Sequence, residues 1–286
     1  MRAYLFLHQL GRTNHGDLLD NLWGNDIADF PTELAMLNLF RLAPADIANF
    51  PRVIKGDLFD LNSGQAIEMP PNKQSGGIQK ITLKFPLFDA IVGNPPYVRY
   101  QSIGAGTLEP SVYRTKLFDR FKFLESTSDL FAFAYAHCAT LLKTNGILAF
   151  VTSNSWLDAE YGLGLKRFFL QNFKIIAVLE SRCEPWFENA RVNTVVTIIQ
   201  KSPAFGIAAS DFLPDDIRDH EVAFVKLKKP IEKIVDCSLS DPARFQKYSR
   251  LWADIEQAQN GLNNATMRIR KRKQQFLFDG VLQELR

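Results

Sequence analysis

The feature that most limits the possible folds of this chain is its alternation of short apolar runs with amphipathic segments. The apolar runs are candidate strands, and they lie at residues 22–23, 53–54, 90–92, 147–151, 175–179 and 195–199. Helical spacing of apolar residues appears at 31–42, 129–142 and 158–169, with Ser128 and Asp129 as caps of the second. This order predicts a doubly wound, mostly parallel α/β fold in which residues 88–92 form a buried strand.

Composition excludes several classes of protein. The 286 residues can bury a sizeable core, and the 46% hydrophobic and 23% charged content is that of a globular chain. No apolar run is long enough to span a membrane. Cys138, Cys183 and Cys237 are odd in number and widely spaced, so neither a disulfide framework nor a zinc site is indicated. We therefore expect a cytoplasmic protein without a metal.

Two long stretches and the end of the chain break the alternation. Residues 60–85 and 98–127 are rich in Gly and Pro and predict loops, of which the second is a candidate for covering a substrate. After residue 202 the pattern weakens. We therefore predict a catalytic domain at 1–202 and a C-terminal extension at 203–286 that contains a basic helix at 249–275.

The net charge of +3 is small, but five cations gather within six residues. They are Arg268, Arg270, Lys271, Arg272 and Lys273. Such a run can neutralise phosphates of a nucleic acid, or it can form a solvated helix face. The sequence leaves both readings open.

The segment Asn94-Pro95-Pro96-Tyr97 carries the strongest chemical signal. It follows a predicted strand, and ligands of open parallel sheets bind beyond the carboxyl ends of the strands. Two prolines make the turn rigid. The Asn94 side-chain oxygen and the Pro95 carbonyl can then accept both hydrogens of one amino group, while the Tyr97 ring stacks on the attached base. The alternative is a proline-rich surface turn.

Asp26 and Asp57 also follow predicted strands. Their carboxylates could accept hydrogen bonds from the ribose hydroxyls and the adenine amino group of a bound nucleoside cofactor. Alternatively, each could cap the helix that follows, which is the commoner role of an isolated Asp at such a position.

Residues 88–97 resemble the catalytic motif of amino-group methyltransferases that depend on S-adenosylmethionine. The stretches 24–27, 55–59, 128–131, 146–157 and 192–196 resemble, in the same order, further motifs of adenine-specific DNA methyltransferases of the type IIG restriction-modification and phage-exclusion kind. The resemblance covers residues 1–202. It implies a Rossmann-like fold, S-adenosylmethionine as cofactor, and methylation of a flipped adenine in DNA.

The same resemblance implies roles for individual residues. Asp26 would hold the cofactor ribose and Asp57 the cofactor adenine. Contacts to the target adenine would come from Asn94, Pro95, Pro96, Tyr97 and Phe187. Phe187 matches the aromatic ring that sandwiches the extruded base, although a phenylalanine in a loop can also be simple packing.

One expected segment is absent from the sequence. These methyltransferases carry a glycine-rich turn, Asp-Pro-Ala-Cys-Gly-Ser-Gly, after their first strand, and no such segment occurs in these residues. Residues 2–7 resemble the helix that follows that turn. We therefore expect the sheet to lack its first strand, and a second chain to supply the glycine-rich motif and a target-recognition domain.

Three other functions remain open at this stage. Methylation of a protein glutamine or of an RNA adenine uses the same Asn-Pro-Pro-Tyr geometry, and a non-catalytic fragment could bind DNA or a partner methyltransferase. The blocks after residue 128, Phe187 and the basic run favour DNA.

The lack of a glycine-rich turn leads to a prediction for the isolated chain. We expect it to bind S-adenosylmethionine weakly or not at all, because one wall of the cofactor pocket would be missing. Calorimetric titration tests this, and a dissociation constant in the micromolar range or tighter would contradict it.

Overall fold

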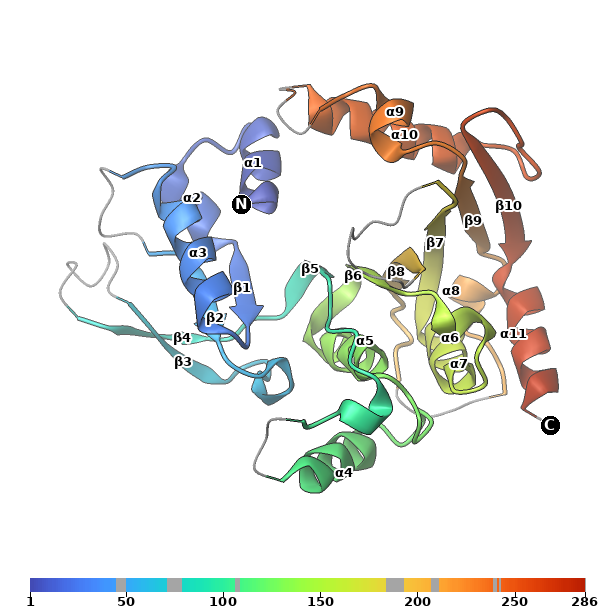
Figure 1. The fold of residues 1–286 in the computed structure, drawn as a ribbon, viewed down its shortest axis with the longest axis horizontal. Helices are drawn as coiled ribbons and strands as arrows, with labels where there is room; N and C mark the ends of the chain where they lie inside the picture. The colour runs from blue at the N-terminus through green and yellow to red at the C-terminus, as the bar shows by residue number, and fades with distance from the viewer. Residues whose placement is uncertain are drawn as a thin grey trace. The chain divides into compact units, whose positions relative to one another are not determined.

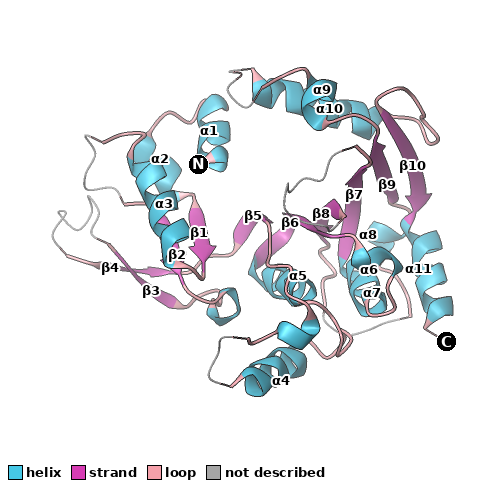
Figure 2. Cartoon of the chain, viewed as in Figure 1, coloured by secondary structure: helices cyan, strands magenta, loops and turns pink. Residues whose placement is uncertain are grey.

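The computed structural model describes residues 1–44, 50–70, 79–105, 109–183, 193–206, 211–238, 241 and 243–285 (Figures 1 and 2). By its internal contacts the chain divides into two compact units, Met1–Leu87 and Phe88–Arg286. The boundary predicted near residue 202 lies within the second unit and stays a prediction. No helix in these described ranges is long and apolar enough to cross a membrane.

The first unit combines short helices with two small sheets. Its elements are α1 (Arg2–Gln9), α2 (His15–Asp20), β1 (Trp23–Asp26), α3 (Asp29–Phe40), β2 (Arg52–Lys55), the 3-10 helix η1 (Leu58–Asp60), β3 (Ala66–Met69) and β4 (Ile81–Lys84). β1 and β2 are parallel, whereas β3 and β4 form an antiparallel pair. A core of Tyr4, Leu18, Leu19 and Leu39 holds α1, α2 and α3 together.

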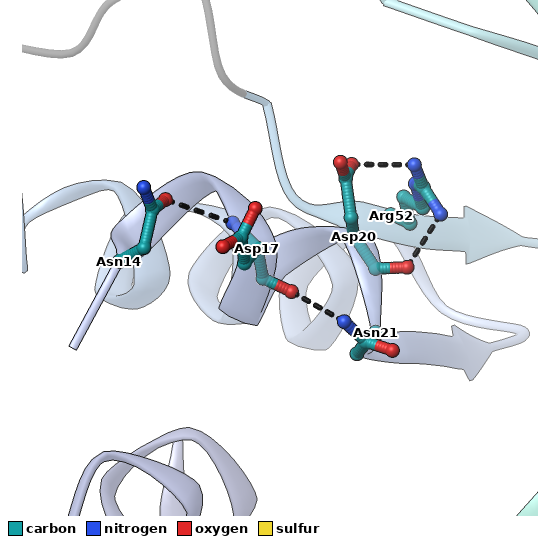
Figure 3. A network of polar contacts seen from close by, with 5 residues as sticks. All are labelled: Asn14, Asp17, Asp20, Asn21 and Arg52. Atoms are coloured by element: carbon teal, nitrogen blue, oxygen red, sulfur yellow. Dashed lines mark hydrogen bonds and ion pairs between the residues drawn. The ribbon is translucent and has the colours of Figure 1, made fainter. Parts of the chain in front are cut away.

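Polar contacts fix α2 against the strands of this unit (Figure 3). The Asn14 side chain accepts a hydrogen bond from the Asp17 amide and so caps the first turn of α2. At the other end, the Arg52 guanidinium donates to the Asp20 carbonyl and pairs with the Asp20 carboxylate. Arg52 also lies over the ring of Trp23. These contacts hold the starts of β1 and β2 in register.

The second unit contains a six-stranded mixed sheet in the order β10-β9-β7-β8-β6-β5. Its strands are β5 (Phe88–Gly93), β6 (Leu142–Ser153), β7 (Phe173–Ser181), β8 (Thr194–Lys201), β9 (Glu221–Leu227) and β10 (Met267–Lys273). The pairings show that β5, β6, β7 and β9 run in one direction and that β8 and β10 run against them. The carboxyl ends of β5, β6, β7 and β9 therefore all lie at the same end of the sheet.

Helices cover both faces of this sheet. The helical elements are η3 (Tyr100–Ser102), α4 (Pro110–Arg120), α5 (Leu130–Leu141), α6 (Ser155–Asp158), α7 (Gly162–Asn172), α8 (Asp215–Arg218), α9 (Ile231–Val235), α10 (Arg244–Gln257) and α11 (Gln274–Glu284). On one face Tyr135 of α5 packs against Phe150 of β6 and Phe169 of α7. On the other, Leu251 and Ile255 of α10 join the core. The predicted doubly wound arrangement is present.

All six predicted strands are found, as β1, β2, β5, β6, β7 and β8, and the helices predicted at 31–42 and 129–142 are α3 and α5. The prediction of a buried strand at 88–92 is wrong. β5 is the edge strand of its sheet, and Val92 is 71% exposed. An apolar run cannot by itself distinguish a central strand from an edge strand.

Three other local predictions need correction. Residues 60–85 contain the pair β3 and β4, and the second predicted loop contains α4, which Pro110 begins in the position that tolerates proline. The helix predicted at 158–169 is present as α7, but it begins at Gly162, and Asp158 is the last residue of the separate short helix α6. A Cβ on Gly162 would clash with the Trp156 carbonyl, so the chain turns there at close range.

The basic helix predicted at 249–275 is wrong. α10 ends at Gln257, and the basic run lies in β10. Met267 and Ile269 alternate with cations and are buried, which is the period of a strand with one face on the core. Apolar residues at every second position, as in a strand, were present in the sequence at 267–269, and this spacing takes precedence over the helical one.

The close packing of α7 makes a prediction about stability. In Gly164→Ala the added Cβ would meet the Phe123 carbonyl and lie 3.3 Å from Leu124 Cα, both backbone atoms that cannot move aside cheaply. We expect a loss of about 1–3 kcal/mol in the free energy of unfolding.

Gly280→Ala in α11 is the matched control, because nothing lies within 4 Å of its Cβ position. A gain of about 0.5–1 kcal/mol is expected there from helix propensity. Chemical denaturation measures both variants, and equal stability of the two would contradict this account.

Candidate active site

The Asn94-Pro95-Pro96-Tyr97 turn leaves the carboxyl end of β5. Gly93, the last residue of β5, lies opposite Phe150 of β6. A Cβ at Gly93 would be 3.2 Å from the Phe150 ring, so the absence of a side chain allows the two strands to meet closely just before the turn. Asn94 is exposed, whereas Pro95 is buried. The turn therefore anchors its first proline and presents the Asn94 amide.

Tyr97 is held through its hydroxyl. The hydroxyl donates a hydrogen bond to the Val151 carbonyl of β6 at 3.1 Å. Burial raises the pKa of Tyr97 to about 12, so the group stays a neutral donor at physiological pH. The half-buried ring is thus held by its far end, as a fixed stacking platform requires.

The segment after the turn is tied to the start of α5. The Leu130 amide donates to the Val98 carbonyl at 2.9 Å, and the Tyr100 amide donates to the Asp129 carboxylate at 3.2 Å. Asp129 is the N-cap residue of α5 by position, as predicted, but its side chain makes no capping bond. Sequence reasoning could not find this role, since the partner lies 29 residues away.

Asp26 and Asp57 lie in the first unit, at the carboxyl ends of the adjacent parallel strands: Asp26 is the last residue of β1, and Asp57 lies two residues after β2. Each accepts a hydrogen bond from the backbone two residues on: Asp26 from Ala28 at 2.9 Å and Asp57 from Phe59 at 3.0 Å. In both residues the acceptor of this bond is Oδ1. The capping interpretation is correct for Asp57, which is the N-cap residue of η1. It is wrong for Asp26, because the N-cap residue of α3 is Ala28 and α3 has no side-chain cap; Asp26 instead closes a local turn before the helix.

Asn25 is a positioning residue of this pair that the sequence did not reveal. Its amide donates to the carbonyls of Ile54 and Gly56 at 3.2 and 3.0 Å. The Gly56 amide in turn donates to the Asp26 carbonyl. These bonds bind the ends of β1 and β2 together and bring the two aspartates to one edge of the small sheet. A strand-end asparagine has no sequence pattern that names its partners.

Phe187, the remaining predicted contact to the target base, lies outside the described residues. The basic run lies along β10, which is the outermost strand on the side of the sheet opposite to β5. Arg268 lies opposite Lys226 in the strand register, at the end of the sheet where β5 also ends. Lys273 lies opposite Glu221, at the other end of the strands. Lys273 also forms an ion pair with Asp219. The run is therefore not one patch beside the turn.

The family model described as Eco57I restriction-modification methylase matches residues 20–187, more than half of the chain. The chain belongs to this family. The matched range includes Asp26, Asp57, the Asn94 turn and Phe187, and it agrees with the resemblance seen in the sequence.

The curated relatives of this chain are methyltransferases that are longer than the chain itself. The type II methyltransferase M.XhoI of Xanthomonas vasicola is 29% identical over 115 residues, which are 40% of this chain and 20% of that protein. The adenine-specific methyltransferase BrxX of Escherichia coli O9:H4 (strain HS) is 29% identical over 147 residues, 50% of this chain and 12% of BrxX. The chain thus spans a fifth or less of these relatives.

Solved structures share the fold. The type IIG restriction endonuclease BpuSI aligns with a TM-score of 0.57 at 18% identity, over 91% of this chain and 25% of BpuSI. The methyltransferase subunit of a type I restriction-modification system from Streptococcus thermophilus aligns with a TM-score of 0.52 at 17% identity, over 92% of this chain and 46% of that one. The predicted Rossmann-like α/β fold is confirmed.

The raised pKa of Tyr97 predicts a pH dependence of stability. Between its ordinary value of 10.0 and about 12, an unfolded chain releases the tyrosine proton that the folded chain keeps, so rising pH favours unfolding. The contribution of this group is complete below pH 10 and is lost above it.

We therefore expect the free energy of unfolding to fall less steeply above pH 10 in Tyr97→Phe than in the wild type. Urea denaturation at a series of pH values measures this. Parallel pH profiles for the two proteins would show that Tyr97 is not the group that resists ionisation.

Proposed function

We propose that this chain is the catalytic portion of a site-specific DNA methyltransferase of a restriction-modification or phage-defence system. It would transfer a methyl group from S-adenosylmethionine to the exocyclic amino group of an adenine flipped out of the duplex. The observation that carries the proposal is the anchored turn from Asn94 to Tyr97 at the carboxyl end of β5. Membership of the Eco57I restriction-modification methylase family supports it.

The turn offers the acceptors that an amino group needs. The Asn94 side-chain oxygen and the Pro95 carbonyl would each accept one hydrogen of the target amine. With both hydrogens so engaged, the lone pair of the nitrogen is directed away from the ring plane and toward an electrophile. Neither acceptor has to change its protonation state, so the contribution is positioning. Pro96 would keep the two acceptors rigid relative to each other.

The residues of the first unit fit the cofactor in their chemistry. Asp26 and Asp57 lie on neighbouring parallel strand ends, where carboxylate oxygens can accept hydrogen bonds from ribose hydroxyls and from an adenine amino group. The cofactor, when bound, supplies a methyl group on a positively charged sulfur. Asn25, through its bonds between the two strand ends, would keep the aspartates at a constant spacing.

Aromatic rings would hold the flipped base. Extrusion of a base costs a few kcal/mol, and stacking on aromatic side chains offsets about 1–3 kcal/mol per base. The Tyr97 ring, held through its hydroxyl on Val151, would be one stacking surface, and Phe187 the other. A fixed ring suits this role because it loses no side-chain entropy when the base arrives.

The partners would be DNA and a second polypeptide segment. The curated relatives extend far beyond the matched region, and BpuSI and the Streptococcus thermophilus subunit are also longer than this chain. We propose that a separate segment or chain supplies the glycine-rich motif and the target-recognition domain.

Asn94→Ala tests the proposed chemistry. We expect methyl transfer to fall by about 100-fold or more while DNA binding stays near normal, because the lost bond matters mainly in the transition state. Tritiated S-adenosylmethionine at high concentration, with DNA, RNA and protein offered separately, measures the transfer. Asn38→Ala on α3 is the matched control and should leave the rate unchanged.

Three results would contradict the proposal. In an assembly with the glycine-rich segment that binds S-adenosylmethionine by calorimetry, transfer by the wild type to none of the three substrates would exclude the activity, and transfer to RNA or protein alone would reassign its substrate. Equal loss of DNA binding and transfer in Asn94→Ala would make Asn94 a structural residue.

A further inference from the structure

Asp129 is an N-cap residue whose carboxylate does not cap its helix. Aspartate is favoured before a helix because its side chain accepts a backbone amide of the first turn. In α5 that bond is not made. The side chain instead turns to two other groups, and this diversion calls for a reason other than helix stability.

The first group is the backbone that follows the Asn94 turn. Asp129 Oδ1 accepts a hydrogen bond from the Tyr100 amide, and the neighbouring Leu130 amide donates to the Val98 carbonyl. One end of α5 therefore binds this segment through both a donor and an acceptor. Only Val98 and Arg99 separate Tyr100 from the catalytic turn.

The second group is the hydroxyl of Tyr161, which donates to Asp129 Oδ2 at 3.1 Å. Tyr161 lies between α6 and α7, and its oxygen is 2.5 Å from Ser155 Oγ. Because the single Tyr161 hydrogen points to the carboxylate, Ser155 must donate to Tyr161. Ser153, 2.8 Å from Ser155 Oγ, then donates to Ser155.

A chain of hydrogen bonds with one direction thus runs from Ser153 at the end of β6 to the carboxylate of Asp129. Burial raises the pKa of Tyr161 to about 12, which keeps its hydroxyl a donor throughout the physiological range. The other charged group that affects Tyr161 is Arg99, which lowers its pKa, in the same segment after the turn. The network connects β6, α5 and the loop without an exposed ion pair.

We propose that Asp129 is a positioning residue that sets the orientation of the Asn94 turn by holding the backbone at Tyr100. The prolines make the turn rigid, so a shift of the segment at 98–100 would be transmitted to Asn94 and Pro95 rather than absorbed. The other end of the turn is fixed by the pairing of β5 with β6. This inference rests on the proposed methyl transfer.

Hydrogen exchange tests the network without any need for catalysis. We expect faster exchange of the Tyr100 amide in Asp129→Ala than in the wild type, because the amide loses its acceptor. Asp129→Asn should preserve the protection, since its Oδ1 still accepts from Tyr100. Its amide can donate to Tyr161, whose hydroxyl then donates to Ser155 in the reverse direction.

Asp158→Ala is the control, because it removes an exposed carboxylate from α6, close in sequence to Ser155 and Tyr161. It should exchange like the wild type. If Asp129→Ala fails to fold, Tyr161→Phe replaces it as a milder variant that removes one bond to the carboxylate, and an intermediate rate of exchange is expected.

Kinetics then separate positioning from structure. In Asp129→Ala we expect kcat for methyl transfer to fall roughly 10- to 100-fold, with the KM for DNA within about a factor of two, since a small misplacement of reacting groups acts on the chemical step. Asp129→Asn should recover kcat to within about fivefold of the wild type, which distinguishes hydrogen bonding from charge.

If the Tyr100 amide exchanged at the same rate in Asp129→Ala as in the wild type, the proposal would be overturned. Faster exchange of this amide together with an unchanged kcat would also overturn it. A rise in KM alone would overturn it too. If the wild type transfers no methyl group even in an assembly that binds S-adenosylmethionine, the proposed function fails, and the exchange experiment still decides whether Asp129 holds the loop.

Discussion

The pairing of β5 with β6 is the interaction on which the candidate site depends. Parallel strands exchange hydrogen bonds along their whole length, so the register of Gly93 with Phe150 sets where the chain leaves the sheet. The next residues then have few choices. Tyr97 reaches back to the Val151 carbonyl of the same β6, and the two prolines between these anchors remove most of the remaining freedom. Asn94 is exposed because its neighbours on both sides are fixed.

The acidic residues at strand ends and helix starts use their carboxylates in different ways in this protein. Asp26 and Asp57 each accept a hydrogen bond from the backbone two residues on, and Asn25 binds the ends of their strands together. Asp129 occupies a capping position and gives its carboxylate to a distant loop and to Tyr161 instead. A carboxylate has two acceptor oxygens, so it can accept hydrogen bonds from two different groups.

Much of the fold could be predicted from the residues in order. The six apolar runs became strands, and α5 followed its apolar spacing. The errors arose where two patterns competed. Met267 and Ile269 alternate with cations as a strand requires, while the charges suggested a solvated helix. The helix predicted from residue 158 begins only at Gly162, which lies in close contact with the Trp156 backbone, and spacing cannot show such a contact.

The sequence by itself determined the chemistry that this chain can offer. The rigidity of Asn94-Pro95-Pro96-Tyr97 and the family motifs around it follow from residue types and their spacing alone. Only the tertiary structure decided which partners hold those residues. Val151 as the acceptor for Tyr97, Asp129 as the acceptor for the Tyr100 amide, and the edge position of β5 all join residues far apart in the chain. Such contacts depend on register and strand order, which local sequence patterns do not encode.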